Sequence, residues 1–399
     1  MGNTTGIMTG LFSKEAGMAW KELSVSEQRQ ALIHRVVTLR WSVTRAAREF
    51  GVSRKTVHKW LKRYRAREPS ALDDRSRRPG RSPSKTADAV ESAVLDVRAR
   101  HGWGPRKIHR TLRDQQVHAV PSVRTVASIL SRRGCIGDAA AAAVPPPPPP
   151  PRPFERAAPN ELWQMDHKGA IEVARQRVCP LVVIDDHSRY CLCFTRVSDL
   201  TMRTTWDVLW GLFERFGLPD AVLCDNAFSA PVGLSWFDAR LVRLNIEPAH
   251  GRPHHPQTQG KVERFNGTAQ RELIDFDARR DSVEHFDQDC ERFRTVYNTV
   301  RPHEALGDLP PVTRWRASVR PRPPTLPEVR YPCGAVTRRV SHGGDLRYQN
   351  ARIVVGRSLT GETMMIEDRE QDVAVYYAWK LVRIIPRALL GGPRSDKVV

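Results

Sequence analysis

Three acidic residues in the middle of the chain have the types and positions that metal-dependent phosphoryl transfer requires. Asp166 falls within a predicted strand, Asp225 at the end of a short buried strand and Glu263 in the first turns of a predicted helix. Two divalent cations about 4 Å apart need several anionic oxygens around one point, and Mg²⁺ prefers carboxylates. One ion then activates the attacking oxygen and the other stabilises the leaving 3′ oxygen. Because the chain has 44 Asp and Glu residues, the spacing alone leaves other triples open.

These carboxylates can meet only if a layered α/β domain positions them, and the pattern of residues 154–320 favours one. Strand ends and helix starts of a single α/β layer bring residues together that are far apart in sequence. Hydrophobic periodicity predicts strands over 162–171, 178–184, 190–196, 221–224 and 245–248, and helices over 202–216, 236–244 and from near 259 onward. The predicted architecture is a mixed sheet with flanking helices.

The N-terminal residues 18–66 have the pattern of a helix-turn-helix DNA-binding domain. Ser24 and Glu27 form a capping-box pattern before a first helix, and residues 43–50 and 54–64 suit two more. Val57, Trp60 and Leu61 form an apolar stripe on the third helix. The basic residues of that helix can enter a major groove, although a helical hairpin with a solvated basic face remains the alternative; they are Lys55, His58, Lys59, Lys62 and Arg63.

Composition shifts divide the rest of the chain. Residues 67–85 are a basic, Pro- and Ser-rich linker, and residues 86–136 predict a second helix-turn-helix-like domain. Residues 137–153 form an Ala/Pro-rich linker, in which seven consecutive prolines predict a polyproline II rod of roughly 22 Å at ~3.1 Å per residue. Residues 328–387 have short strands with Gly turns, which we interpret as a small C-terminal β-barrel.

The charge distribution points to a polyanionic partner. The net charge is +20, of which residues 1–153 carry +17, residues 154–320 carry −2 and the remainder +5. Basic flanks suit a DNA backbone, and an acidic middle suits a metal site. No run approaches the ~20 apolar residues of a membrane span, and no secretory signal is visible. Seven scattered cysteines suit reduced thiols in the cytosol.

Several runs resemble the integrase core of bacterial insertion-sequence transposases, a retroviral-integrase-type (DDE) core of the ribonuclease-H-like superfamily. These runs are NELWQMD (160–166), VIDDHSRY (183–190), LCDN (223–226), HGRPHHPQTQGKVERFN (250–266) and YNTVRPHEALG (297–307). WKELSVSEQR, FGVSRKTVHKWLKRYR and LDDRSRRPGRSP resemble the N-terminal helix-turn-helix region of one such family. The resemblance covers about residues 18–320, and its most specific part is the run that leads into Glu263.

The resemblance implies a fold, a site and a reaction. The fold is a five-stranded mixed sheet flanked by helices, and Asp166, Asp225 and Glu263 are its three acidic ligands for two Mg²⁺ or Mn²⁺ ions. The implied reaction is cleavage at transposon ends followed by strand transfer into target DNA. The alternatives are a catalytically inert, transposase-derived DNA-binding regulator and a nuclease without strand transfer.

The same resemblance implies partners and a location. The partners are double-stranded terminal inverted repeats and target DNA, and two ends that must be joined together imply a homodimer or a larger homo-oligomer. We expect a cytoplasmic, nucleoid-associated protein without a membrane partner. Two positions depart from the family pattern: Ala227 stands where Gly follows Asp-Asn, and Gln270 stands where Lys or Arg often faces DNA phosphate. If position 227 needs a positive φ, Ala costs about 1 kcal/mol there.

Polar residues around Glu263 form a second group of candidate DNA contacts. Arg271 is next to Gln270 but points about 100° around a regular helix. A solvated loop is the alternative for the residues that precede the helix. The candidates are Arg252, His254, His255, Gln257, Gln259, Lys261 and Arg271.

Other conspicuous residues have ordinary structural interpretations. Asp185 and Asp186 lie where the chain reverses, so turn capping is favoured over metal binding. Cys191 and Cys193 are expected as buried thiols on one strand face, without a zinc site. Trp206 and Trp210 are four residues apart on a helix, which favours a core position over base stacking. The residues of YNTVRPH are expected to be structural, with a phosphate contact as the alternative.

Overall fold

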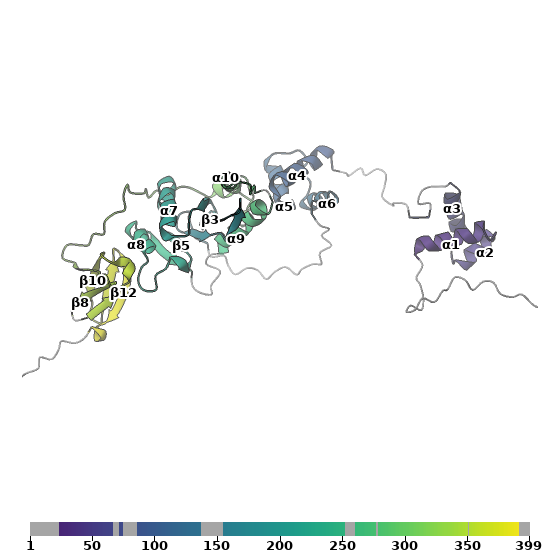
Figure 1. The fold of residues 1–399 in the computed structure, drawn as a ribbon. Helices are drawn as coiled ribbons and strands as arrows, with labels where there is room; N and C mark the ends of the chain where they lie inside the picture. Colours follow the sequence, from purple (N-terminus) through teal and green to yellow (C-terminus); the bar gives the residue numbers. More distant parts are fainter. Residues whose placement is uncertain are drawn as a thin grey trace, which may run out of the picture. The chain divides into compact units, whose positions relative to one another are not determined.

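The structure is a computed structural model that describes residues 24–66, 72–74, 86–136, 155–251, 260–276, 278–349 and 351–390. The chain divides into two compact units, Met1–Lys85 and Thr86–Val399 (Figure 1). Within the described ranges, every helix is too short or too polar to cross a membrane.

Unit 1 contains a three-helix bundle, as its sequence predicts. The helices are α1 (Val25–Val37), α2 (Val43–Glu49) and α3 (Arg54–Arg65), and each begins at a serine cap. Ser24 and Glu27 form the predicted capping box. The bundle closes over one small core that includes the predicted apolar stripe; its buried members are Leu32, Ile33, Ala46, Ala47, Val57, Trp60 and Leu61.

Unit 2 begins with a second three-helix module, called here the α4–α6 module. Its helices are α4 (Asp88–His101), α5 (Pro105–Asp114) and α6 (Val123–Arg132). Gly102, in the left-handed conformation, ends α4, Pro105 occupies the first position of α5, and Ser122 caps α6. The module has its own core, which contains Val94, Val97, Trp103, Ile108, Leu112, Val126, Ile129 and Leu130.

The central domain is built on a mixed sheet with the strand order β4-β3-β1-β5-β6. These strands are β1 (Trp163–His167), β3 (Gln176–Asp185), β4 (Cys191–Val197), β5 (Ala221–Cys224) and β6 (Glu247–His250). β3 is antiparallel to β1 and β4, whereas β5 is parallel to β1 and β6. The predicted strand over 162–171 is interrupted, because residues 168–170 leave the ladder and β2 (Ile171–Val173) pairs separately with the start of β3.

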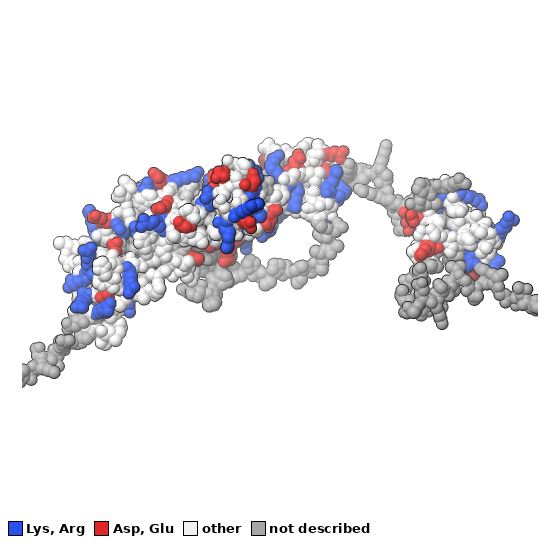
Figure 2. All heavy atoms as spheres, in the orientation of Figure 1, with Lys and Arg blue, Asp and Glu red and all other residues white. Residues whose placement is uncertain are grey.

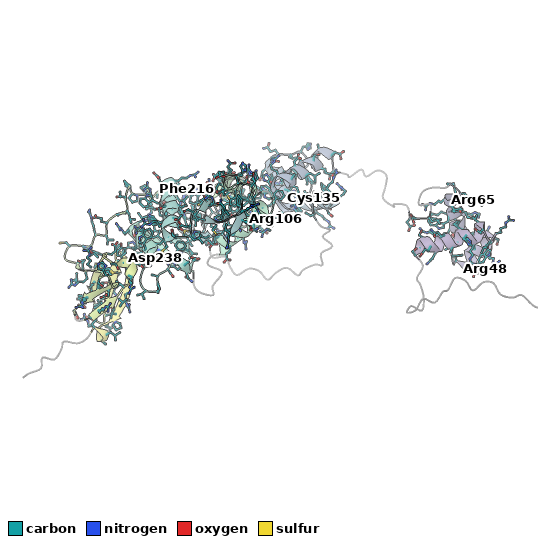
Figure 3. All side chains as sticks on the ribbon, viewed as in Figure 1. Arg48, Arg65, Arg106, Cys135, Phe216 and Asp238 are labelled. Carbon is teal, nitrogen blue, oxygen red and sulfur yellow. The ribbon has the colours of Figure 1, made fainter. Side chains whose placement is uncertain are left out.

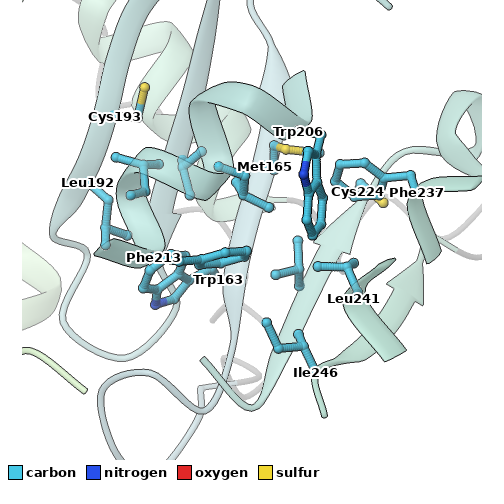
Figure 4. Packing of buried hydrophobic residues seen from close by; sticks show 14 of the residues in the cluster. Trp163, Met165, Leu192, Cys193, Trp206, Phe213, Cys224, Phe237, Leu241 and Ile246 are labelled. Atoms are coloured by element: carbon cyan, nitrogen blue, oxygen red, sulfur yellow. The ribbon is translucent and has the colours of Figure 1, made fainter. Parts of the chain in front are cut away.

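Helices cover both faces of this sheet, and alternation along the strands decides which side chains each face receives. Trp163 and Met165 point to the face covered by α7 (Met202–Phe216) and α8 (Trp236–Arg243), where they enter the largest core (Figure 4). The opposite face packs against α9 (Gly260–Ala269) and α10 (Val283–Thr299). Trp206 is 8% exposed within the first core, which confirms its structural interpretation.

The expectation that Cys191 and Cys193 share one strand face is wrong. The β3–β4 register shifts between Val183 and Ile184, so that Val183 pairs with Cys193 and Ile184 with Cys191. This bulge turns Cys193 toward the α7 side and Cys191 toward the α9 side. Both thiols are buried, as predicted, and burial raises the pKa of Cys193 to about 12.

The C-terminal region forms a four-stranded antiparallel sheet in the order β12-β11-β10-β7 and a separate β8-β9 ribbon. The sheet strands are β7 (Val336–Arg339), β10 (Thr363–Asp368), β11 (Asp372–Tyr377) and β12 (Lys380–Pro386), and the ribbon strands are β8 (Asp345–Tyr348) and β9 (Ala351–Val354). Among the described residues β12 and β7 do not pair, so the closed barrel stays a prediction. Trp379 Nε1 donates to the Val242 carbonyl at 2.9 Å, which ties this sheet to α8.

Candidate active site

Asp166 and Asp225 lie on neighbouring parallel strands at the same edge of the sheet. The β1–β5 register pairs Gln164 with Leu223, so two further residues along each chain place Asp166 level with Asp225. By the same alternation Asp166 shares the face of Gln164, the face covered by α9. Both aspartates are half-buried. The sequence therefore brings two carboxylates, 59 residues apart, to one point on the sheet.

Helix α9 supplies the third carboxylate and an amide that contacts the first. Glu263 is exposed in the first turn of α9, and Asn266 lies three residues later on the same helix face. Asn266 Nδ2 donates to Asp166 Oδ2 at 2.8 Å. Asn266 was not among the predicted site residues, although its spacing of three from Glu263 was a signal that could have identified it.

The electrostatics of Asp166 show that the three carboxylates influence one another. Burial raises the pKa of Asp166, and the Asp225 carboxylate raises it further. The hydrogen bond from Asn266 opposes this shift, and Glu263 adds a smaller repulsion. A partly desolvated carboxylate that faces two other anionic groups is a site where a bound cation relieves repulsion.

The three carboxylates have the ligand chemistry that a hard divalent cation prefers, and a further oxygen, from Asn266, lies beside Asp166. All three carboxylates offer oxygen ligands. Among the described residues, Asn266 Oδ1 is buried and has no hydrogen-bond partner. Within the described ranges, no three His, Cys, Asp or Glu side chains are yet arranged closely enough to hold one ion. Metal binding would therefore draw these side chains together from their present positions.

A buried polar chain fixes the start of α9, and so the position of Glu263. Gln164 Oε1 accepts from the Val262 amide at 3.3 Å, while Gln164 Nε2 donates to Asp186 Oδ1 at 2.7 Å. Lys261 Nζ lies 2.5 Å from the same Asp186 oxygen, and Asp186 is fully buried. The Lys261 side chain is only 15% exposed, so it points into the protein here, and its predicted DNA contact stays a prediction.

The neighbouring aspartate has the predicted capping role. Asp185 Oδ1 accepts from the Ser188 amide at 2.7 Å and from the Ser188 hydroxyl at 2.5 Å, and Asp185 Oδ2 accepts from the Asn160 amide. These bonds close the turn between β3 and β4. They confirm the capping interpretation of Asp185, whereas Asp186 serves instead as the partner of Lys261.

The two departures from the family pattern have local explanations in the structure. Ala227 lies in the short helix Asn226–Phe228, outside the positive-φ residues, and its amide donates to Asp225 Oδ1 at 3.1 Å. Ala therefore carries no left-handed strain there. Gln270 Oε1 accepts from Lys168 Nζ at 2.9 Å. Lys168, which directly follows β1, therefore places a cation beside the position where the family pattern often has Lys or Arg.

The remaining candidate DNA contacts fall into three groups. Lys55, His58, Lys59 and Lys62 are exposed on α3, and Arg63 is half-buried beside the Trp60 ring. Arg271 is exposed in η3, a π-helical turn (Gln270–Ile274), where the regular helix geometry assumed from the sequence no longer holds. The loop candidates Arg252, His254, His255, Gln257 and Gln259 lie outside the described residues. DNA binding by all of these residues stays a prediction.

The YNTVRPH segment is structural, as expected. Asn298 bonds both the amide and the carbonyl of Cys191, at 2.8 and 2.9 Å. Arg301 forms two hydrogen bonds of 2.8 Å with Glu272. Burial, followed by the neighbouring Arg301, lowers the pKa of His303 to about 3, so this imidazole is neutral at physiological pH.

Family models match most of the described chain. An integrase core domain model matches residues 156–256 and a second one residues 244–311. Homeodomain-like domain models match residues 24–73 and 56–130.

The solved structures that match this chain are distant from it. The HTLV-2 integrase catalytic core domain in complex with magnesium is 16% identical over 40% of this chain and 97% of its own, with a TM-score of 0.30. The simian T-cell lymphotropic virus intasome in complex with the PP2A regulatory subunit B56 gamma is 17% identical over 72% of this chain and 97% of that chain (TM-score 0.35). The BIV integrase catalytic core is 19% identical over 39% and 92% (TM-score 0.31). The family models show that this chain carries an integrase core domain behind N-terminal homeodomain-like domains.

Proposed function

We propose that this protein is a DNA transposase that cleaves DNA at transposon ends and transfers the freed strand into target DNA. One observation carries the proposal: within the integrase core, Asp166 and Asp225 lie level on neighbouring parallel strands, and α9, which bears Glu263, contacts Asp166 through Asn266. Burial and the Asp225 and Glu263 carboxylates also raise the pKa of Asp166, and a carboxylate perturbed in this way is typical of a catalytic site.

Asp166, Asp225 and Glu263 would hold the two Mg²⁺ or Mn²⁺ ions. When bound, such ions supply a nucleophilic hydroxide or alkoxide and stabilise the leaving 3′ oxygen. The protein's own residues set the geometry. Asn266 orients the Asp166 carboxylate through its 2.8 Å hydrogen bond, and Gln164 fixes the first turn of α9 through the Val262 amide.

DNA recognition falls to the helical domains in this proposal. The exposed basic residues of α3 suit a major groove, and the net charge of +17 over residues 1–153 suits phosphate contacts. Terminal inverted repeats are the expected sites, and two ends that are cut and joined together require at least a homodimer. The loop residues that precede α9, together with Arg271, are the proposed contacts near the cleaved strand, whereas Lys261 points into the protein.

The test uses purified full-length protein, Mn²⁺ and an end-labelled duplex that carries the element's terminal repeat. The proposal expects nicking at the end and joined products with a target plasmid. Asp225→Asn should abolish both, whereas Asp207→Asn, on the exposed side of α7, should leave them unchanged. Nicking without joined products would indicate a nuclease, and tight DNA binding without nicking would indicate an inert regulator.

A further inference from the structure

A buried charged cluster joins the α4–α6 module to the catalytic core. Its centre is Glu272, in the π-helical turn η3 that directly follows α9. From the module, Trp103 Nε1 donates to Glu272 at 3.0 Å and Lys107 Nζ pairs with it at 2.5 Å. From the core, Arg301 adds its two 2.8 Å bonds. The Glu272 side chain is 11% exposed, so these partners largely replace water around its charge.

Apolar contacts and a charged rim surround this cluster. The Phe276 ring lies against Gly102, where an added Cβ would stand only 3.0 Å from a ring carbon. Val296 of α10 packs against the core of the module. At the exposed edge Arg106 pairs with Glu304 at 2.6 Å and with Asp308 at 3.1 Å, at the boundary between module and core (Figure 3). The contact therefore has the buried centre and polar rim of a specific interface.

The charges around Glu272 favour the docked arrangement of the α4–α6 module and the catalytic core. Burial alone would raise the pKa of Glu272, but Arg301 and Lys107 outweigh it and lower the pKa to about 2. The carboxylate is therefore ionised at neutral pH and needs both cations. Separation of the module would remove Lys107 and the Trp103 indole from this carboxylate, so the docked state has two charge-assisted contacts that the separated state lacks.

Among the described residues, the docked face of the module leaves part of its last helix exposed. The core contacts come from the α4–α5 turn and the first half of α5. Helix α6 begins at the Ser122 cap and keeps Arg124 and Ser128 exposed. In helix-turn-helix domains the second helix of the pair reads the major groove while the first supports it. Here the supporting helix is the one fastened to the catalytic domain.

We propose that the Glu272 cluster holds the α4–α6 module and the catalytic core as one rigid body, so that a duplex bound by α6 meets the Asp166 site at a fixed distance along the DNA. Glu272 and Lys107 are then positioning residues that set where the strand is cut. The inference rests on the proposed function for its cleavage step, whereas the docking itself does not depend on activity.

The test compares Lys107→Met, which keeps the aliphatic stem but removes the charge, with Arg110→Met on the same helix. Arg110 pairs with Asp114 inside the module and so serves as the matched control. In hydrogen exchange without DNA, Lys107→Met should raise exchange at α5 and η3 on the order of tenfold, since a charge-assisted bond across the contact is lost. Arg110→Met and Lys107→Arg should keep wild-type exchange in η3.

Cleavage then reports the positioning role. With an end-labelled duplex and Mn²⁺, the wild type, Arg110→Met and Lys107→Arg should cut at one position. Lys107→Met should bind the duplex equally well but distribute its cuts over neighbouring phosphates. A single cut and wild-type exchange in Lys107→Met would overturn the proposal. Absence of any cut in the wild type would instead refute the proposed function, and the exchange comparison would still decide whether the docking is rigid.

Discussion

At the scale of single residues, Asp166 combines a structural cost with the proposed function. Its carboxylate is half-buried and faces two like charges, and Asn266 is the donor that compensates it. Active sites often retain such unfavourable charge because the reaction uses it. The cost should be measurable as stability, separately from any activity.

We predict that Asp166→Asn stabilises the metal-free protein while abolishing nicking. Because the pKa of Asp166 lies above its ordinary value, ionisation disfavours the folded state as the pH rises through that range, and neutral Asn removes this cost at pH 7. The Asn carbonyl can still accept from Asn266. Thermal unfolding in EDTA should show a Tm higher by about 1–3 °C. A lower Tm would mean that the carboxylate stabilises the fold, contrary to the repulsion described above.

Lys261 distinguishes a structural from a DNA-binding role. Lys261→Met leaves the fully buried Asp186 without its cation, so we expect a loss of about 3 kcal/mol in the free energy of unfolding. The dependence of DNA affinity on salt should stay unchanged. Lys62→Met, on the exposed face of α3, should instead leave the free energy of unfolding nearly unchanged and weaken the salt dependence of DNA affinity. A fall of about one in the salt slope for Lys261→Met would show that Lys261 contacts phosphate after all.

At the scale of elements, local sequence patterns predicted most helices and strands but few contacts between them. The serine cap at Ser24, and the strand that ends at Asp225, follow from signals within a few residues. These signals also placed the three carboxylates on the correct elements.

The rest depended on distant partners, which periodicity does not specify. Lys261 looked like a surface cation because Asp186, 75 residues earlier, is adjacent only in the folded sheet. The docking of Trp103 on Glu272 spans 169 residues. The π-turn that presents Glu272, and the bulge that separates Cys191 from Cys193, are likewise set by packing.

The Glu272 contact should weaken in acid over a defined range. Its pKa of about 2 lies below the ordinary 4.5, so its contribution to stability is complete above about 4.5 and is lost as the pH falls toward 2. We predict that the difference in unfolding free energy between wild type and Glu272→Gln is largest near neutral pH and shrinks across this range. Denaturant unfolding at several pH values measures it. A difference independent of pH would contradict an ionised Glu272 at the contact.

At the scale of the whole molecule, the net positive charge and the candidate catalytic carboxylates lie in different parts of the chain. Acidic and basic side chains are interspersed over the visible face of unit 2 (Figure 2). The net charge of +17 lies in residues 1–153, which span unit 1 and the α4–α6 module. DNA attraction is thus concentrated N-terminally, while the carboxylates lie in a domain of nearly balanced charge.

The two units should fold independently but bind DNA together. The core of α1–α3 is built from residues of unit 1, and the cores around the central sheet from residues of unit 2. Deletion of Met1–Lys85 should therefore leave the Tm of the remaining unit unchanged.

The same deletion should weaken binding to the terminal repeat and flatten its salt dependence, because the phosphate contacts of α3 are removed. Calorimetry and binding titrations at several salt concentrations measure the two effects. A lower Tm would show that unit 1 stabilises unit 2, and an unchanged salt slope would assign the phosphate contacts to the α4–α6 module and the catalytic core.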